Sequence, residues 1–400
     1  MNSMRFRTIG LIAVLGFQLV FFSCSKDDNT PEYQPEFLHD HMEMEDYTKE
    51  EIINNISSGG EFSDEIQAII HYDVAGIKIT YNTVDVNGDD ILASGALLFP
   101  KNASSELPMI SFQHGTIISE DEAPSNYQSD FNYMGAMFAS TGFIIAMPDY
   151  IGYGASADVS HPYEHRQTLA TACRDMIRAG KEYFKVKGIN QPDPNLFLTG
   201  YSEGGFATMA TYKLLQEEHS DEFNIKAVTA GAGAYDKSSF MDWVLSSNED
   251  LEYINNYLWV LDSYNTIYSN LQRPYSYYFN EPWASEIEGS GVLAFDGESN
   301  PSNLFHPDFA DGVINGTDSA FINAIADNNC FDWKPNAPLQ LYHGTNDTMV
   351  PYFNSQAAYD AMISQGTTEV ELIPIQDGTH ISSVADYAMG TFTFFLNQLY

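Results

Sequence analysis

The sequence predicts an α/β fold in which a mostly parallel central sheet is covered by helices on both faces. Short apolar runs alternate with longer segments of helical periodicity from residue 109 onward, which is the pattern of parallel strands joined by crossover helices. The chain has 400 residues, of which 44% are hydrophobic, enough to bury a large core in one domain. One large domain with an insertion is therefore favoured over several small domains.

The N-terminal residues have the anatomy of an export signal. Two arginines precede an apolar run over residues 9–22, which is too short to span a bilayer and ends at a small residue followed by Cys24. This pattern predicts that residues 1–23 are a signal peptide and that Cys24 becomes a lipidated N-terminus, which anchors the protein in a membrane. A plain secreted protein with a free thiol at Cys24 is the alternative.

The residues after Cys24 are polar and acidic. Residues 24–45 include two prolines, which suits a tether between a membrane and a domain spanning residues 46–400. The segment 25–28, Ser-Lys-Asp-Asp, resembles the acidic export tag of Bacteroidetes surface lipoproteins. The resemblance implies an exported lipoprotein of the outer membrane that is exposed at the cell surface, with the periplasmic face as the alternative.

The elements of the domain follow in order. A helix is predicted near residues 47–56, and a hairpin follows, with strands over 77–81 and 92–99 around the turn residues Asn87-Gly88. Further strands are expected over 109–112, 143–147, 196–198, 225–230, 339–342 and 370–374, and helices near 131–140, 164–184, 205–215, 355–363 and 381–399.

The alternation stops between about residues 235 and 335. A gap of this length is too long for a loop, so an inserted helical cap is expected there. The insertion is dense in aromatic residues. They suit the cap's own core, and the alternatives are a tunnel for an acyl chain or platforms on which sugars stack.

The segment Gly200-Tyr201-Ser202-Glu203-Gly204 lies between a predicted strand and a predicted amphipathic helix. A serine on such a turn is held at strained backbone angles with its hydroxyl exposed. Residues two before and two after it must be nearly free of side-chain atoms, and both are glycine. Ser202 is therefore the candidate nucleophile of an enzyme.

A serine hydroxyl is a poor nucleophile near neutral pH, so it needs a contacting base and a carboxylate that orients the base. Asp347 follows the second-last predicted strand and His380 follows the last one, and we expect both to reach Ser202. His343 is the alternative base and Asp377 the alternative acid.

The tetrahedral intermediate of such a reaction needs two fixed donors for its oxyanion. The backbone N–H of Glu203 is one candidate, and the backbone N–H of Thr116 is the other, because Gly115 lets that loop approach closely. No metal and no organic cofactor is expected for this chemistry.

Four segments carry a resemblance to a known family: Gln113–Thr116, Met147–Ser156, His161–Tyr163 and Tyr201–Gly205. From about residue 77 to residue 400 the chain resembles the α/β-hydrolases, and more narrowly the secretory lipase group related to fungal lipase A. The resemblance implies cleavage of carboxylic esters through an acyl-enzyme. It also implies that Ser202, Asp347 and His380 are the catalytic triad, and that Thr116 and Glu203 supply the oxyanion hole.

The net charge of −38 at pH 7 excludes nucleic acid as a partner. The expected partner is a small-molecule, lipid or glycan ester. Three alternatives to a lipase-like enzyme stay open: a carbohydrate-linked acyl or feruloyl esterase, a serine peptidase and a non-catalytic binding module. A peptidase of the prolyl-oligopeptidase type would need an N-terminal propeller, for which too few residues precede the first predicted strand. The acyl chain and the oligomeric state are left open by the sequence.

Overall fold

The computed structural model describes residues 33–59 and 68–399. The chain divides into two units, Met1–Gln34 and Pro35–Tyr400, and the second unit carries the fold. The expected signal peptide, Cys24 and the first part of the expected tether lie outside the described residues. None of the helices in the described ranges combines the length and the hydropathy that a membrane span requires.

In the described part of the chain, nine strands form one sheet in the order β1-β2-β3-β5-β4-β6-β7-β8-β9. The pairs from β1 to β5 are antiparallel, and every pair from β5 to β9 is parallel. The strands are β1 (Leu38–Tyr47), β2 (Val74–Val84), β3 (Asp90–Pro100), β4 (Met109–Gln113), β5 (Ile144–Pro148), β6 (Asn195–Tyr201), β7 (Asn224–Gly231), β8 (Leu339–Gly344) and β9 (Val370–Ile375).

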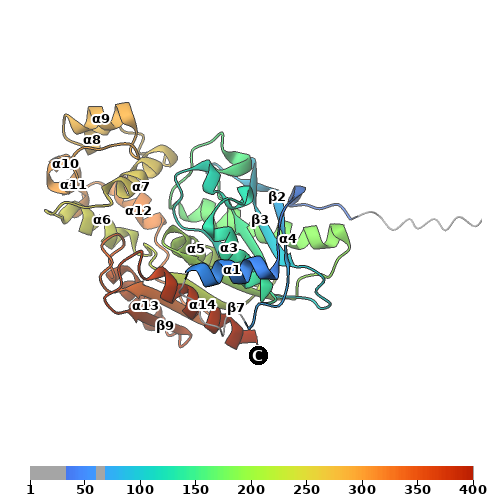
Figure 1. Ribbon diagram of the computed structural model, residues 1–400. Coiled ribbons are helices and arrows are strands. Elements are labelled where there is room, and N and C mark those ends of the chain that lie inside the picture. Colours follow the sequence, from blue (N-terminus) through green and yellow to red (C-terminus); the bar gives the residue numbers. More distant parts are fainter. Residues whose placement is uncertain (1–32, 60–67, 400) are drawn as a thin grey trace, which may run out of the picture. The chain divides into compact units, whose positions relative to one another are not determined.

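Helices cover both faces of this sheet (Figure 1). On one face, α4 (Arg166–Lys187), α5 (Glu203–Glu218) and α13 (Phe353–Ser364) pack against the strands in one buried cluster. On the other face, α1 (Lys49–Gly59), α3 (Asp130–Ser140) and α14 (Val384–Leu399) enclose a second cluster. Three short 3-10 helices, η1 (Glu120–Glu122), η2 (Pro124–Asn126) and η3 (Gly154–Ser156), lie in the connections. The fold class expected from the sequence, an α/β-hydrolase fold, is confirmed.

The chain between β7 and β8 is helical. It comprises α6 (Lys237–Ser246), α7 (Ile254–Ile267), α8 (Tyr275–Tyr278), α9 (Trp283–Ser290), α10 (Pro301–Leu304), α11 (Pro307–Ile314) and α12 (Ser319–Asp327). In Figure 1 these helices gather beside the part that holds the sheet. They share a buried cluster of their own that is rich in aromatic side chains, and Val350 from the loop after β8 joins it.

Two segments differ from the sequence-based expectation. Residues 38–45, which the acidic composition assigned to the tether, lie in β1, an edge strand that pairs antiparallel with β2. The terminal helix begins at Val384, later than the expected start near residue 381, because the preceding residues form the loop that carries His380.

The reason β1 escapes the sequence pattern is that it is exposed on both faces along most of its length. A charged edge strand shows no alternation of apolar and polar residues, and its charges protect the open edge from pairing with other chains. The start of β1 is held in place by a residue that lies far away in the sequence. The carboxylate of Glu182 on α4 accepts the backbone N–H groups of Glu36, Phe37 and Leu38 at 2.7–2.9 Å.

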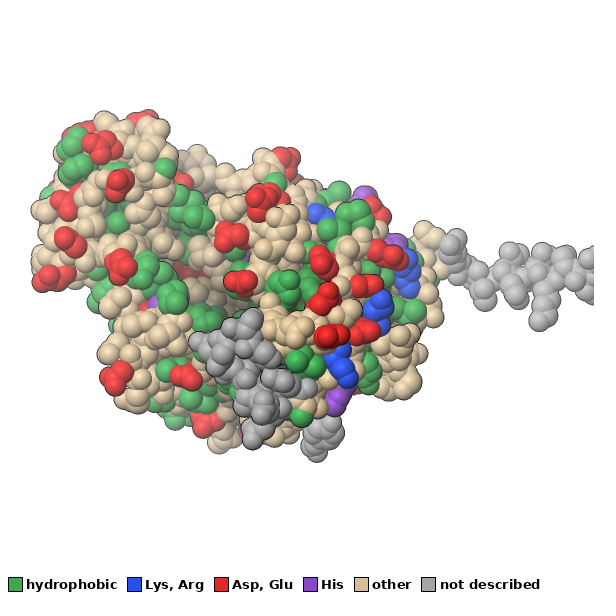
Figure 2. All heavy atoms as spheres, viewed as in Figure 1, with side chains coloured by type: hydrophobic (Ala, Val, Ile, Leu, Met, Phe, Trp, Pro, Cys, Tyr) green, Lys and Arg blue, Asp and Glu red, His purple; other side chains and the backbone are tan. Residues whose placement is uncertain are grey.

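Acidic side chains are scattered over the face seen in Figure 2, and basic side chains are few on that face. The pattern agrees with the net charge of −38. Charges of one sign spread in this way keep a protein soluble and repel anionic macromolecules.

Candidate active site

Ser202 lies at the sharp turn between β6 and α5. Its backbone angles are φ 60° and ψ −124°, a region that non-glycine residues rarely adopt. The backbone N–H of Ser202 donates to the carbonyl oxygen of Gly231 at 2.9 Å, which ties the turn to β7. The strained turn that the sequence predicted is present, and it leaves the Ser202 side chain half-buried at the carboxyl edge of the sheet.

The two flanking glycines are required by close backbone contacts. A Cβ atom at Gly200 would lie 2.3 Å from the carbonyl oxygen of Gly204, and one at Gly204 would lie 2.1 Å from the carbonyl oxygen of Gln113. Real Cβ atoms do not approach backbone oxygens this closely. The packing of α5 against β6 and β4 therefore depends on the absence of side chains at these two positions.

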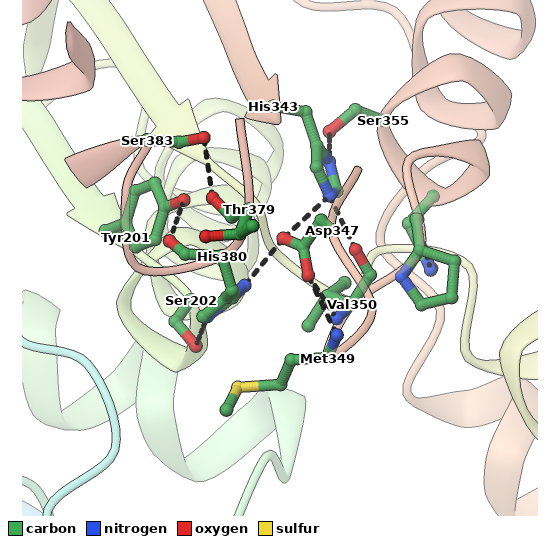
Figure 3. Close-up of polar contacts among 12 residues, drawn as sticks. Tyr201, Ser202, His343, Asp347, Met349, Val350, Ser355, Thr379, His380 and Ser383 are labelled. Atoms are coloured by element: carbon green, nitrogen blue, oxygen red, sulfur yellow. Dashed lines mark hydrogen bonds and ion pairs between the residues drawn. The ribbon is translucent and has the colours of Figure 1, made fainter. Parts of the chain in front are cut away.

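His380 joins the serine to an aspartate, as Figure 3 shows. Its Nε2 atom is 2.8 Å from Oγ of Ser202, and its Nδ1 atom is 2.6 Å from Oδ2 of Asp347. When Nδ1–H donates to the carboxylate, Nε2 carries a lone pair that accepts the serine hydroxyl proton. The structure thus brings together Ser202, His380 and Asp347, three residues the sequence analysis selected.

Asp347 is a buried carboxylate with four neighbours that favour its charged form. Its Oδ1 atom accepts the backbone N–H groups of Met349 and Val350, each at 2.9 Å. Nε2 of His343 lies 3.3 Å from Oδ2, beside His380. Burial acts to raise the pKa of Asp347, but the hydrogen bonds from His343 and His380 outweigh burial and lower this pKa to about 2. Asp347 is therefore ionised throughout the neutral range.

The two rival residues lie elsewhere. His343 on β8 is fully buried, and its ring nitrogens lie 2.7 Å from Oγ of Ser355 and 2.7 Å from the carbonyl oxygen of Val350. It supports Asp347 and does not contact Ser202. Asp377 is exposed, and its backbone N–H donates to Oγ1 of Thr345 at 2.9 Å.

The loop that carries His380 is attached to the turn that carries Ser202. The hydroxyl of Tyr201, the residue before Ser202, donates to the carbonyl oxygen of His380 at 2.7 Å, and the two rings are 5.3 Å apart. The hydroxyl of Ser383 donates to the carbonyl oxygen of Thr379 at 2.7 Å. These bonds fix the imidazole over the serine from both sides of the loop.

The loop after β4 lies against the same turn. A Cβ atom at Gly115 would be 3.2 Å from the carbonyl oxygen of Tyr201 and 3.8 Å from Cβ of Ser202. Oγ1 of the next residue, Thr116, is hydrogen-bonded to the hydroxyl of Tyr163 at 2.8 Å. Thr116 and Ser202 line one cavity. The backbone of this loop is therefore close enough to the serine to contribute a donor.

Glu203 follows the serine, yet its carboxylate is turned into the protein. Its side chain is 1% exposed, and its Oε1 atom lies 2.8 Å from Nε2 of His161. Nδ1 of His161 lies 2.6 Å from the carbonyl oxygen of Ile151. The acidic side chain is thus paired with a histidine and leaves the N-terminus of α5 open for other groups.

Two cavities meet at Ser202. The first, which we call the cap-side cavity, lies between α6 and α7 on one side and the loops before α4 and after β8 on the other. The second, the loop-side cavity, is the more spacious of the two and lies between the Thr116 loop and the His380 loop. Ser202, Asn256 and Met349 line both.

Several residues of the site were not selected from the sequence. His161 was noted within a family-like segment but not as the partner of Glu203. Lys237 and Glu164, which line the cap-side cavity, form an ion pair across 73 residues of chain, so no local spacing could reveal them. Across the described ranges, no group of histidine, cysteine, aspartate and glutamate side chains is arranged to hold a metal ion.

The chain is similar in sequence to known secretory lipases. The model of the secretory lipase family matches residues 125–281. A secreted triacylglycerol lipase of Malassezia furfur, LIP2, is 23% identical over 323 residues, which cover 74% of this chain. The chain spans 65% of the length of that relative.

Solved structures share the fold. A provisionally assigned hydrolase of Legionella pneumophila is 26% identical, with a TM-score of 0.80 over 91% of this chain and 98% of its own. The rice cell wall degrading esterase LipA of Xanthomonas oryzae is 24% identical, with a TM-score of 0.75 over 90% and 97% of the two chains. Lipase A of Candida antarctica in its closed state is 16% identical, with a TM-score of 0.64 over 88% and 82%. The expected likeness to the α/β-hydrolases and the secretory lipases is confirmed.

Proposed function

Starting from an α/β-hydrolase fold whose residues 125–281 match the secretory lipases, we propose that this protein is a serine carboxylic ester hydrolase. One observation carries the proposal. An unbroken row of hydrogen bonds joins Asp347, His380 and Ser202 at a strained strand-to-helix turn, with contacts of 2.6 and 2.8 Å. A fold that served only for binding would have no need of this arrangement.

In the proposed reaction, Oγ of Ser202 attacks the carbonyl carbon of the ester while Nε2 of His380 takes the hydroxyl proton. The ionised carboxylate of Asp347 stabilises the imidazolium that forms. His380 then gives the proton to the oxygen of the leaving alcohol, and the acyl group stays on Ser202. In the second half, His380 deprotonates a water molecule, which attacks the carbonyl carbon of the acyl-enzyme. The bond from that carbon to Oγ of Ser202 then breaks, Oγ takes the proton back from His380, and the carboxylic acid is released.

The backbone N–H groups of Thr116 and Glu203 serve as donors to the oxyanion of each tetrahedral intermediate. The close approach of Gly115 to Ser202 and the position of Glu203 at the start of α5 support this assignment. The pairing of the Glu203 carboxylate with His161 supports it as well, because that contact turns the negative charge away from the developing oxyanion.

Residues 235–335 act as a cap in this proposal and provide most of the walls of the cap-side cavity. Apolar side chains dominate those walls, and each methylene buried there contributes up to ~0.8 kcal/mol. We expect kcat/KM to rise from acetyl to medium-chain esters. A profile with acetyl esters best would favour hydrolysis of short acyl groups on glycans instead.

The proposal extends to export. The apolar run before Cys24 and the acidic residues after it support secretion through a signal peptide and anchoring of the mature protein by lipid on Cys24. The outer membrane is the proposed location, on the strength of the lipoprotein-like segment 25–28.

Ser202→Ala tests the proposed nucleophile. We expect the variant to lose labelling by a fluorophosphonate probe and to lose ester hydrolysis by a factor on the order of 10⁴ or more. Ser290→Ala, which removes an exposed serine at the end of α9, is the control and should keep both signals. Substantial hydrolysis by Ser202→Ala, or probe on another serine, would refute the assignment.

A further inference from the structure

The cap-side cavity contains a buried ion pair. Nζ of Lys237, the first residue of α6, donates to Oε2 of Glu164, which precedes α4. The two side chains are 4% and 8% exposed, and both line the cavity that Ser202 also lines. The ammonium group lies 4.1 Å from the centre of the Phe206 ring, one turn of α5 after the serine.

This pair has hydrogen-bonding capacity left over. A lysine ammonium has three N–H donors and a carboxylate has two acceptor oxygens. Among the described residues, the hydrogen bond to Glu164 is the one that Nζ of Lys237 makes, and Oε1 of Glu164 accepts none. A buried ion pair is on balance a weak source of stability compared with apolar residues of the same volume. Its unused donors and acceptor are thus available to a molecule in the cavity.

The pair and Ser202 line the same cavity, along one side of which α7 runs. Asn256, near the start of α7, lines both cavities and so marks their junction at Ser202. Tyr264, eight residues further along α7, donates from its hydroxyl to the backbone carbonyl oxygen of Glu164 at 3.0 Å. Eight residues of helix correspond to about 12 Å. Much of the remaining wall is apolar and is formed by side chains such as Phe240, Met241 and Val260.

The position of His380 indicates which part of the ester each cavity would receive. This residue must pass its proton to the leaving alcohol, so the alcohol lies on its side of the serine. His380 lines the loop-side cavity and is not among the residues that line the cap-side cavity. The loop-side cavity therefore receives the alcohol, and the cap-side cavity receives the acyl group.

We infer that the cap-side cavity selects an acyl group that carries a hydroxyl at its far end, accepting a hydrogen bond from Lys237 and donating one to Glu164. This inference rests on the proposed ester hydrolysis and names its substrate class. A hydroxyl both donates and accepts. A carboxylate would be repelled by Glu164, an ammonium would be repelled by Lys237, and a methyl terminus would leave both charged groups unpaired.

Two sources of acyl group share this chemistry: ω-hydroxylated aliphatic acids and para-hydroxylated aromatic acids. The experiment measures kcat/KM for two matched pairs of para-nitrophenyl esters. One pair is ω-hydroxyoctanoate and octanoate, and the other is coumarate and cinnamate. Within each pair, the kcat/KM of the hydroxylated ester divided by that of its partner measures the contribution of the hydroxyl alone. A hydrogen bond to a charged group predicts a preference of about tenfold or more for the hydroxylated member of at least one pair.

The double variant Lys237→Met/Glu164→Leu removes both charges together, so that neither is left buried alone, and keeps a similar apolar volume. We expect its ratio to fall to one or below, because an apolar wall offers a hydroxyl no partner. Lys213→Met is the matched control. Lys213 also pairs with a glutamate, Glu217, and lies near an aromatic ring, but this pair is on the outer part of α5.

The outcomes separate the two proposals. A preference in one pair of esters only supports the inference and identifies the source as aliphatic or aromatic. A ratio near one in the wild type for both pairs, or an unchanged preference in the double variant, overturns the inference while ester hydrolysis stands. If no ester is hydrolysed and Ser202 takes up no fluorophosphonate, the proposed function fails and the inference falls with it.

Discussion

Replacing Asp347 with asparagine should lower kcat and should weaken the dependence of the free energy of unfolding on pH. The side chain keeps its shape, but it loses the negative charge that His380 and His343 face. In triads of this kind, such a change lowers kcat by a factor on the order of 10⁴. The imidazolium loses the negative charge that stabilises it, and the imidazole is no longer held in the tautomer that leaves Nε2 free to accept a proton. Asp377→Asn is the control, since Asp377 is exposed on the loop of His380, and it should keep nearly full activity.

The effect on stability follows from the pKa of Asp347. This pKa is lowered from 3.8 to about 2 in the folded protein, where burial is outweighed by the hydrogen bonds from the two histidines. A shift of this size corresponds to about 2 kcal/mol of the free energy of unfolding. Because the folded pKa is the lower one, the stabilisation is complete above about pH 5 and disappears as the pH falls through the folded pKa.

The assay compares urea unfolding of the wild type and Asp347→Asn at pH 6 and at pH 2. We expect the wild type to exceed the variant in free energy of unfolding at pH 6, and this excess to shrink by about 2 kcal/mol at pH 2, where the Asp347 carboxyl is about half protonated in the folded state and almost fully protonated in the unfolded state. An excess that is equal at the two pH values would show that the histidines do not hold this carboxylate in its charged form.

Three further predictions test other parts of the structure. Gly204→Ala should lower the free energy of unfolding by more than ~2 kcal/mol, because its Cβ would lie 2.1 Å from the carbonyl oxygen of Gln113; a neutral result in urea titrations would contradict that packing. Tyr201→Phe should lower the free energy of unfolding by about 1 kcal/mol, because the carbonyl oxygen of His380 loses its hydrogen-bond donor. It should also lower kcat more than it changes KM, and an unchanged kcat would show that Tyr201 does not position His380. Cys24→Ser should move the protein from the membrane fraction to the soluble fraction, and equal membrane retention would refute lipid anchoring at that cysteine.

The central part of the site could be predicted because topology does most of the assembly. Ser202, Asp347 and His380 each follow a strand of the parallel part of the sheet, and the carboxyl ends of parallel strands lie at one edge. Once the strands were recognised from their apolar runs, the meeting of the three residues followed from chain order alone. The glycines around Ser202 added a local signal, since a strained turn demands them.

The partners of these residues could not be predicted in the same way. The contacts of Glu203 with His161 and of Lys237 with Glu164 join loops and insertion helices that no repeating backbone pattern relates. The pair of Lys237 with Glu164 also depends on the position of the helices between β7 and β8, which share an aromatic core of their own. The edge strand β1 was missed for a related reason, because an exposed charged strand held by the distant Glu182 carries no hydrophobic period.

The sheet with its loops and the insertion between β7 and β8 should determine different properties of the enzyme. The loops at the carboxyl edge of the sheet carry the proposed nucleophile, base, acid and oxyanion donors, so the proposed chemical step depends on the regular part of the fold. The insertion contributes α6 and α7 to one wall of the cap-side cavity, so the choice of acyl group depends on side chains whose positions the regular fold does not dictate. Changes at Lys237 should therefore alter the ranking of substrates, whereas changes at Asp347 should lower the rate for all of them.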